Sequence, residues 1–151
     1  MIQPMAQREM AHEFSGFFEN AAQGRLCFPH CATCNRFHWY PMPLCPHCRN
    51  RDVRWQEIPG RGDLFSWTVV RHPFDPRLAE LVPYVVGLVT FAQAPGIRLV
   101  TTIVDAAPAI LRIGMAVEPV FHATPLRAAF PDSGSQLCFR PVGDTPQADA
   151  K

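Results

Sequence analysis

Two short cysteine pairs, Cys31-Ala32-Thr33-Cys34 and Cys45-Pro46-His47-Cys48, dominate the first third of the chain. The ten residues between them, 35–44, suffice for a short hairpin that brings the two turns face to face. Each Cys-x-x-Cys turn can present both sulfurs, so the pairs together offer four thiolates at tetrahedral positions around one ion. Soft thiolates favour Zn²⁺ in this geometry, with iron as the main competitor. The spacing therefore predicts a rubredoxin-like zinc ribbon.

The predicted ion has a structural role. Residues 25–51 are rich in Cys, His, Pro and Arg and poor in aliphatic residues, so they cannot build a conventional core. Ordering each residue costs on the order of 1–2 kcal/mol in backbone entropy, and zinc-finger peptides gain roughly 10–16 kcal/mol from the ion. Four sulfur ligands also leave no coordination position open for a substrate. We expect one structural Zn²⁺ per chain, bound by Cys31, Cys34, Cys45 and Cys48.

Other readings of these cysteines and histidines stay open. Unligated buried thiols and a redox pair compete with metal binding, but two pairs at ribbon spacing suit a ligand set better. Cys27 could replace a ligand, although a symmetric set needs no fifth sulfur, and Cys138 lies in an apolar strand as expected for core filler. His30, His38 and His47 could each replace a sulfur, but histidines in solvent or around the site are the simpler interpretation.

Composition excludes several classes of protein. The chain has 151 residues with a formal net charge of +1, whereas a general nucleic-acid binder is usually much more basic. An apolar content of 48% allows a packed core and argues against disorder. Five of the six cysteines lie within residues 27–48, which is not the spread of a disulfide scaffold. The N-terminus lacks the pattern of a secretory signal, no stretch is long enough to span a membrane, and we expect a reducing cytoplasmic location.

A helix is predicted ahead of the cysteine pairs. Met10, Phe14, Phe17 and Ala21 follow three-to-four spacing over residues 8–24, and Phe18 widens the apolar stripe. Gly24 is a natural helix end. The expected organisation has four parts: an N-terminal helix at 1–24, the zinc ribbon at 25–52, a barrel at 53–143 and a flexible polar tail at 144–151.

The third part is mainly β. Trp55–Ile58 and Leu64–Val70 are expected as one long strand, bent at Gly60-Arg61-Gly62. The other apolar and β-branched runs, separated by turn residues and one predicted helical turn at Pro108–Leu111, are Tyr84–Phe91, Ile97–Val104, Val117–His122 and Gln136–Val142. Sixteen prolines argue against a helix bundle. A five-stranded OB-fold barrel is the leading prediction, and a small sandwich is the alternative.

The chain is poor in catalytic machinery. It contains no Gly-x-Ser-x-Gly elbow, no phosphate-binding loop and no His-Glu-x-x-His motif. His72 lies in a predicted turn, where a solvated histidine is the ordinary interpretation. An enzyme acting alone is therefore not expected.

The combination of these features resembles a known family. The helix with paired phenylalanines, the two cysteine pairs, 55–62 (WQEIPGRG) and 66–70 (SWTVV) resemble the zinc-ribbon/OB-fold acyl-CoA-associated proteins, long known only as a domain of unknown function. The runs 83–89 (PYVVGLV) and 113–117 (IGMAV) are similar to strand signatures of that family. The resemblance extends over about residues 13–142 and is specific only as a combination.

This resemblance implies a non-catalytic accessory subunit. Such proteins accompany or are fused to thiolase-like proteins of the lipid-transfer type, or to hydratase-like proteins, and support carbon–carbon bond cleavage or formation on acyl-CoA thioesters. The family's ribbon is structural, and its four cysteines correspond to Cys31, Cys34, Cys45 and Cys48. Its barrel is implied to contact the acyl-CoA or the partner, so a hetero-oligomer with such an enzyme is expected.

The excess basic charge of the ribbon suggests where contacts occur. Residues 25–61 contain six arginines against two acidic residues, a net charge of +4. A solvated basic face is one interpretation, and contact with CoA phosphates or an acidic partner is the other, because guanidinium binds both anions bidentately. Aromatic side chains beyond what a small module can bury indicate a partner surface. The candidate contact residues are Arg49, Arg51, Arg61, Phe17, Phe18 and Trp39.

A second function class is a single-stranded nucleic-acid binding module, since zinc ribbons and OB barrels both do that work. Phe65, Trp67 and Tyr84 could stack on bases. However, 66–104 contains three arginines opposed by two acidic residues, which is a weak basic groove. A purely structural oligomer is a third reading.

Overall fold

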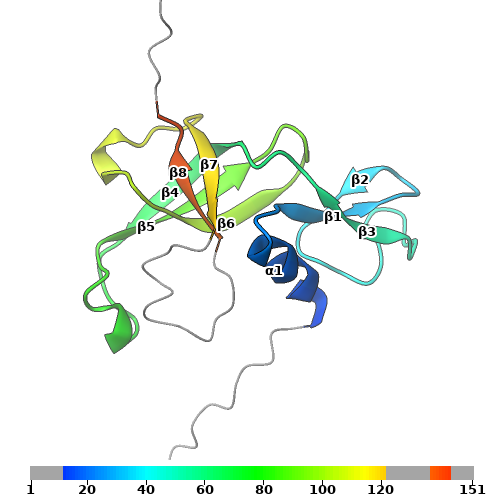
Figure 1. Cartoon of the computed structure of the whole chain (residues 1–151), viewed down its shortest axis with the longest axis horizontal. Helices are drawn as coiled ribbons and strands as arrows, with labels where there is room; N and C mark the ends of the chain where they lie inside the picture. The colour runs from blue at the N-terminus through cyan, green and yellow to red at the C-terminus, as the bar shows by residue number, and fades with distance from the viewer. Residues whose placement is uncertain (1–11, 122–136, 144–151) are drawn as a thin grey trace, which may run out of the picture.

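The computed structural model describes residues 12–121 and 137–143. Figure 1 shows two parts side by side, a small sheet with a helix against it and a larger closed barrel. The first part, called the ribbon part below, contains η1 (His12–Phe14), α1 (Ser15–Ala22), β1 (Cys27–Cys31), β2 (Arg36–Phe37) and β3 (Val53–Glu57). The barrel contains β4 (Gly62–Val70), η2 (Pro76–Leu78), β5 (Tyr84–Thr90), β6 (Arg98–Ile103), η3 (Pro108–Ile110), β7 (Ala116–Phe121) and β8 (Leu137–Pro141).

The N-terminal helix is shorter than the apolar spacing predicted. It begins at Ser15 after the 3₁₀ turn η1, and the N-terminal part of the predicted stripe, including Met10, lies outside the described residues. The helix ends where Gly24 adopts φ of +73°, a conformation that glycine reaches without a steric cost. Phe17 and Ala21, one helical turn apart, are the helix residues that are buried.

The small sheet has the order β2-β1-β3 and is antiparallel throughout. The prediction of one long bent strand over residues 55–70 is wrong. β3 pairs with β1, from Cys27↔Glu57 to Cys31↔Val53, whereas β4 belongs to the barrel. Ile58 still donates its N–H to the Leu26 carbonyl, and this last bond between the two strands lies directly before Pro59. The chain therefore leaves the first sheet at this proline and enters the second at Gly62.

The barrel confirms the predicted five-stranded OB-like closure. Its strand order is β4-β5-β6-β8-β7, and β7 returns to pair with β4. All neighbours are antiparallel except β6 and β8, which are parallel. The register of β4 against β5 shifts between Leu64 and Ser66, which leaves the intervening Phe65 in a bulge. Closure removes free strand edges from the barrel.

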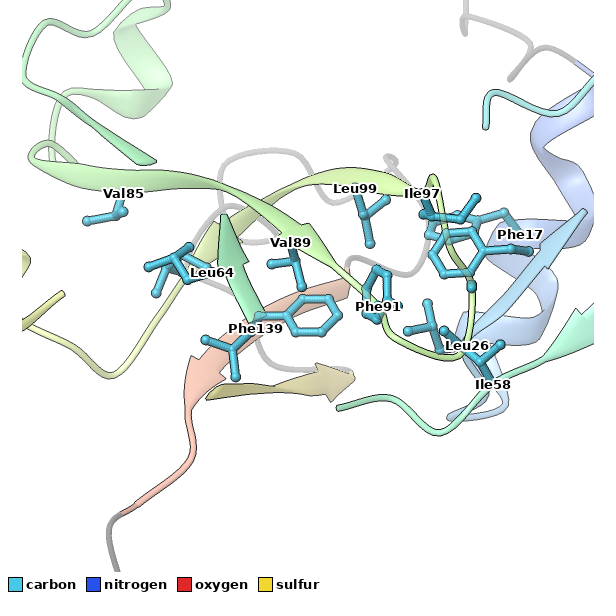
Figure 2. Packing of buried hydrophobic residues seen from close by; sticks show 14 of the residues in the cluster. Phe17, Leu26, Ile58, Leu64, Val85, Val89, Phe91, Ile97, Leu99 and Phe139 are labelled. Carbon is cyan, nitrogen blue, oxygen red and sulfur yellow. The ribbon is translucent and has the colours of Figure 1, made fainter. Parts of the chain in front are cut away.

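One hydrophobic core runs through both parts. Phe28 on β1 lies with its ring centroid 6.1 Å from that of Phe17 on α1 and 5.3 Å from that of Phe91, which follows β5. Phe91 in turn lies 5.9 Å from Phe139 on β8. Figure 2 shows Phe91 between Phe139 on one side and Phe17 and Leu26 on the other. Because this aromatic chain crosses the junction, the ribbon part and the barrel are held in a fixed relative position.

Candidate functional site

The four predicted ligands come together as one group. Their Sγ atoms all lie within 4.8 Å of one another. The Cys31–Cys48 and Cys34–Cys45 sulfur pairs are each 3.6 Å apart. Four sulfurs about 2.3 Å from a tetrahedral Zn²⁺ lie about 3.8 Å from one another. The observed sulfur spacing and the soft donor set therefore fit one Zn²⁺ ion.

Two similar turns hold these sulfurs. Asn35, directly after the first pair, has φ of +55° and donates its N–H to the Cys31 carbonyl at 2.9 Å. Arg49, directly after the second pair, has φ of +62° and donates its N–H to the Cys45 carbonyl at 2.9 Å. Both turns thus end in a left-handed residue that reverses the chain around the metal position. The predicted contact residue Arg49 is therefore part of the metal turn through its backbone.

The thiols of the group differ in pKa: that of Cys31 is lowered, whereas those of Cys34 and Cys48 are raised. The backbone N–H groups of Cys34 and Thr33 point at the Cys31 sulfur and lower the pKa of that thiol to about 6. Burial and the neighbouring thiols raise the pKa of Cys34 to about 12. At neutral pH Cys31 is thus available as a thiolate, while Cys34 keeps its proton until a metal displaces it. Metal binding therefore releases protons and weakens as the pH falls.

The remaining cysteines lie outside the metal group. Cys27 is 2% exposed at the start of β1, and burial raises the pKa of its thiol. Cys138 is 1% exposed on β8, in the position expected for core filler. Among the described residues, the cluster able to hold a metal consists of the four cysteines and includes no histidine. His30 instead packs against Phe37, with ring centroids 4.7 Å apart.

His38 is buried without a partner for its ring. It is 5% exposed, and neither ring nitrogen has a hydrogen-bond partner within the described part of the chain. Burial and the charge of His47 lower the pKa of His38. The sequence marked this histidine only as a substitute ligand, because nothing in its spacing showed that its ring would be enclosed.

Two hollows lie outside the metal centre. The helix–barrel cavity, of about 410 Å³, separates α1 and Trp39 from strands β5, β6 and β8. The part of its lining that the structure describes has no charged side chain and consists of Phe14, Phe17, Phe18, Trp39, Tyr84, Val86, Leu99, Val100, Thr101, Thr102, Leu137 and Cys138. The ribbon groove, of about 350 Å³, lies beside β3 and is lined by Glu13, Ser15, Pro29, Pro41, Met42, Pro43, Arg51, Val53, Arg54 and Trp55.

The predicted contact residues fall in different places. Phe18 and Trp39 are half-buried walls of the helix–barrel cavity, and Phe17, only 6% exposed, forms part of its floor. Arg51 lines the ribbon groove, whereas Arg61 is exposed in the segment that connects β3 to β4. The barrel residues that line the cavity could not be predicted from the sequence, because only the pairing of the barrel strands brings them opposite α1. The apolar run Pro41-Met42-Pro43 within the metal-binding segment is the sequence feature that could have indicated the groove.

No helix in residues 12–121 and 137–143 is long and apolar enough to cross a bilayer.

Comparison with known proteins identifies both parts of the chain. Residues 18–54 match the family model described as "ChsH2, rubredoxin-like zinc ribbon domain", and residues 55–122 match "ChsH2, C-terminal OB-fold domain". A probable enoyl-CoA hydratase alpha subunit of Thermomonospora curvata is 43% identical over 101 residues, which cover 67% of this chain and 30% of that protein. The chain therefore spans under a third of this relative.

Smaller relatives and solved structures point to the same family and fold. A DUF35 domain-containing scaffold protein of Pyrococcus furiosus is 33% identical over 114 residues, covering 75% of this chain and 71% of that protein. The "Ltp2-ChsH2(DUF35) aldolase" structure matches with a TM-score of 0.74 and 34% identity, covering 88% of this chain and 97% of that one. A DUF35 protein of Sulfolobus solfataricus, at 18% identity and a TM-score of 0.58 over 87% of each chain, shares the fold.

Removing one ligand tests the metal centre. We expect Cys45→Ser to lower bound zinc from about one equivalent to under half, because three sulfurs and a hydroxyl bind the ion far more weakly. Metal analysis of purified protein measures this. Cys27→Ala, which deletes a buried thiol outside the group, should keep one equivalent. Equal zinc content in the two variants would contradict the assignment.

His38 predicts a pH dependence of stability. Its pKa is lowered in the folded chain, so the unfolded chain binds the proton more readily and stability falls as the pH drops below about 6.5. We expect zinc-loaded His38→Phe to lose less stability than the wild type between pH 7 and pH 5.5 in denaturant titrations. His72→Phe, at an exposed histidine, should follow the wild type. A His38→Phe curve parallel to the wild-type curve would disprove the assignment.

Proposed function

The chain belongs to the DUF35 family of ChsH2-like zinc-ribbon and OB-fold proteins, and we propose that it is a non-catalytic accessory subunit of an enzyme acting on acyl-CoA thioesters. The names of the relatives support this proposal, since they include a hydratase alpha subunit, scaffold proteins and an aldolase complex. The partner is a thiolase-like protein of the lipid-transfer type or a hydratase-like protein, and the reaction with the former is carbon–carbon bond cleavage or formation. The free thiols suit a reducing cytoplasm.

The metal centre carries the argument for a supporting role. Cys31, Cys34, Cys45 and Cys48 would fill all four positions of a tetrahedral Zn²⁺, so the ion would hold the ribbon's turns together and offer no site for a substrate oxygen. The chain's own residues therefore contribute shape and contacts, and the partner contributes the reacting groups.

The helix–barrel cavity is the place where the chain would contact an acyl group. The described lining, uncharged and mostly apolar, suits the acyl part of a CoA thioester and disfavours its phosphates. Phe18 and Trp39 supply one wall, and Val86, Leu99 and Thr102 lie on the strands opposite. The phosphates would lie outside the cavity, because its described lining offers no basic side chain to bind them.

The barrel gives less support to nucleic-acid binding. Base stacking on an OB barrel needs basic side chains beside the aromatic ones. The five barrel strands carry two basic residues, Arg98 and Arg140. Arg140 is paired with Glu118 at 2.9 Å, and Arg98 is stacked 4.4 Å over the Phe65 ring. Two such side chains make a poor track for a phosphate backbone.

Purification from the native cell tests the proposed function. We expect the tagged, zinc-loaded chain to co-purify with a thiolase-like or hydratase-like subunit, identified by mass spectrometry. The pair should hydrate or cleave an acyl-CoA substrate faster than the enzyme subunit alone. Recovery of the chain alone, with tight oligonucleotide binding at physiological salt, would favour the nucleic-acid function.

Filling the cavity tests the acyl contact. We expect Thr102→Trp to raise the KM of the complex for a long-chain acyl-CoA at least fivefold, because the indole occupies the space of the acyl group. The subunits should remain associated in size-exclusion chromatography. Ala79→Trp places the same side chain on an exposed position directly after η2, outside the cavity lining, and should leave KM unchanged. Equal KM values for both variants would place the acyl group elsewhere.

A further inference from the structure

We propose that the ribbon groove docks an extended, acidic segment of the enzyme partner, which adds a strand to the outer edge of β3. This inference rests on the proposed function, because the enzyme subunit is the protein that would supply the segment. It identifies the surface that holds the complex together, which the fold and the relatives' names leave open. Three observations carry it: an edge strand, a groove beside that strand, and unpaired positive charge within the groove.

The hydrogen bonds flanking β3 determine which edge is available. Ala32 donates its N–H to the Asp52 carbonyl, and Ile58 donates its N–H to the Leu26 carbonyl. In an antiparallel ladder alternate residues bond the neighbouring strand, so the residues at even positions between these two bonds face β1. Trp55 and Glu57 therefore direct their N–H and C=O groups away from β1. No other strand within the described residues pairs with this edge.

The groove lies where the side chains of an added strand would point. Pro29 and Trp55 are directly opposite each other in the β1–β3 ladder and share one face of the sheet. Both line the groove, with Val53 on the same face and Met42, 42% exposed, on the loop opposite. Trp55 is fixed from behind, because Gly16 of α1 packs so closely on its indole that no side chain fits between them. Alternate side chains of a bound segment would thus meet a rigid apolar floor.

The charge of the ribbon part selects an acidic segment. Its two acidic residues in the range 25–61 are already paired, Asp52 with Arg54 at 2.8 Å and Glu57 with Arg25 at 4.0 Å. The other four arginines of this range are exposed and have no ion pair within the described residues: Arg36, Arg49, Arg51 and Arg61.

Of these four arginines, Arg51 lines the groove, where its guanidinium is free to bind a carboxylate bidentately. Glu13 lines the groove from the segment that precedes α1. The two opposite charges therefore come from different elements and give the groove a polarity. The acidic residue of the docked segment lies at Arg51, and a second acidic residue beside Glu13 would be repelled.

Charge reversal at Arg51 tests the groove against a matched control. Arg36 on β2 is also exposed and unpaired in the described structure, so Arg36→Glu changes the net charge by the same amount at the opposite edge of the sheet. We expect Arg51→Glu to weaken the affinity for the co-purified enzyme subunit at least about tenfold, and Arg36→Glu less than about threefold. Both variants should bind one equivalent of zinc. If both variants weakened the affinity equally, the effect would come from net charge alone, and the proposal would be overturned.

Amide hydrogen exchange tests the strand addition directly. In the complex we expect the Trp55 and Glu57 N–H groups to exchange at least tenfold more slowly than in the free chain. An enzyme subunit that binds while these amides exchange unchanged would overturn the docking proposal and leave the proposed function standing.

A peptide probe tests the groove even if no enzyme subunit is found to bind the chain. Acetyl-(Asp-Val)₃-amide should shift the amide resonances of Met42, Val53 and Trp55 in the zinc-loaded chain, and acetyl-(Lys-Val)₃-amide should not. Shifts from both peptides, or from neither, would overturn the docking proposal. Failure of the proposed function would appear instead as the absence of any acyl-CoA enzyme in the complex.

Discussion

Convergence of four sulfurs on one position is the constraint on which the ribbon part depends. Residues 25–52 contain too few aliphatic side chains to order themselves, and the sulfur group joins the turn after β1 to the turn that precedes β3. With those turns fixed, β1 and β3 pair in a single register and place Phe28 toward the barrel. The metal centre therefore acts at a distance, because it orients the strand that carries the junction aromatic residue.

The aromatic junction explains how a small ribbon can position side chains against a barrel. Phe28 contacts Phe17 on α1 and Phe91 beyond β5, so helix, ribbon and barrel share one core. A flexible linker between two independent domains would leave the space between α1 and β6 undefined. Here the helix–barrel cavity has two walls held by the same buried cluster, which makes it a preformed hollow.

Sequence patterns predicted the parts of this structure that depend on local spacing. Cys31, Cys34, Cys45 and Cys48 were assigned together because a tetrathiolate site needs little beyond two turns, and the barrel strands were found because alternation and turn residues mark them. The patterns failed where pairing between distant segments decides the outcome. Trp55–Ile58 has the composition of a barrel strand, yet it pairs with β1, and the enclosure of His38 depends on packing around it. Both hollows likewise arise from elements that only the fold brings together.

The distribution of charge distinguishes the ribbon groove from the helix–barrel cavity. Within residues 25–61 both acidic residues form ion pairs, and four arginines have no ion pair with any residue that the structure describes. Like charges gathered on one small module repel one another, so this surplus is an energetic cost for the isolated chain. An acidic partner surface would reduce that repulsion. The helix–barrel cavity, whose described lining is uncharged, has no such interaction with an acidic surface. The charged surface is therefore suited to holding a protein and the uncharged one to holding an apolar group, while the four sulfurs fix the turns of the ribbon part.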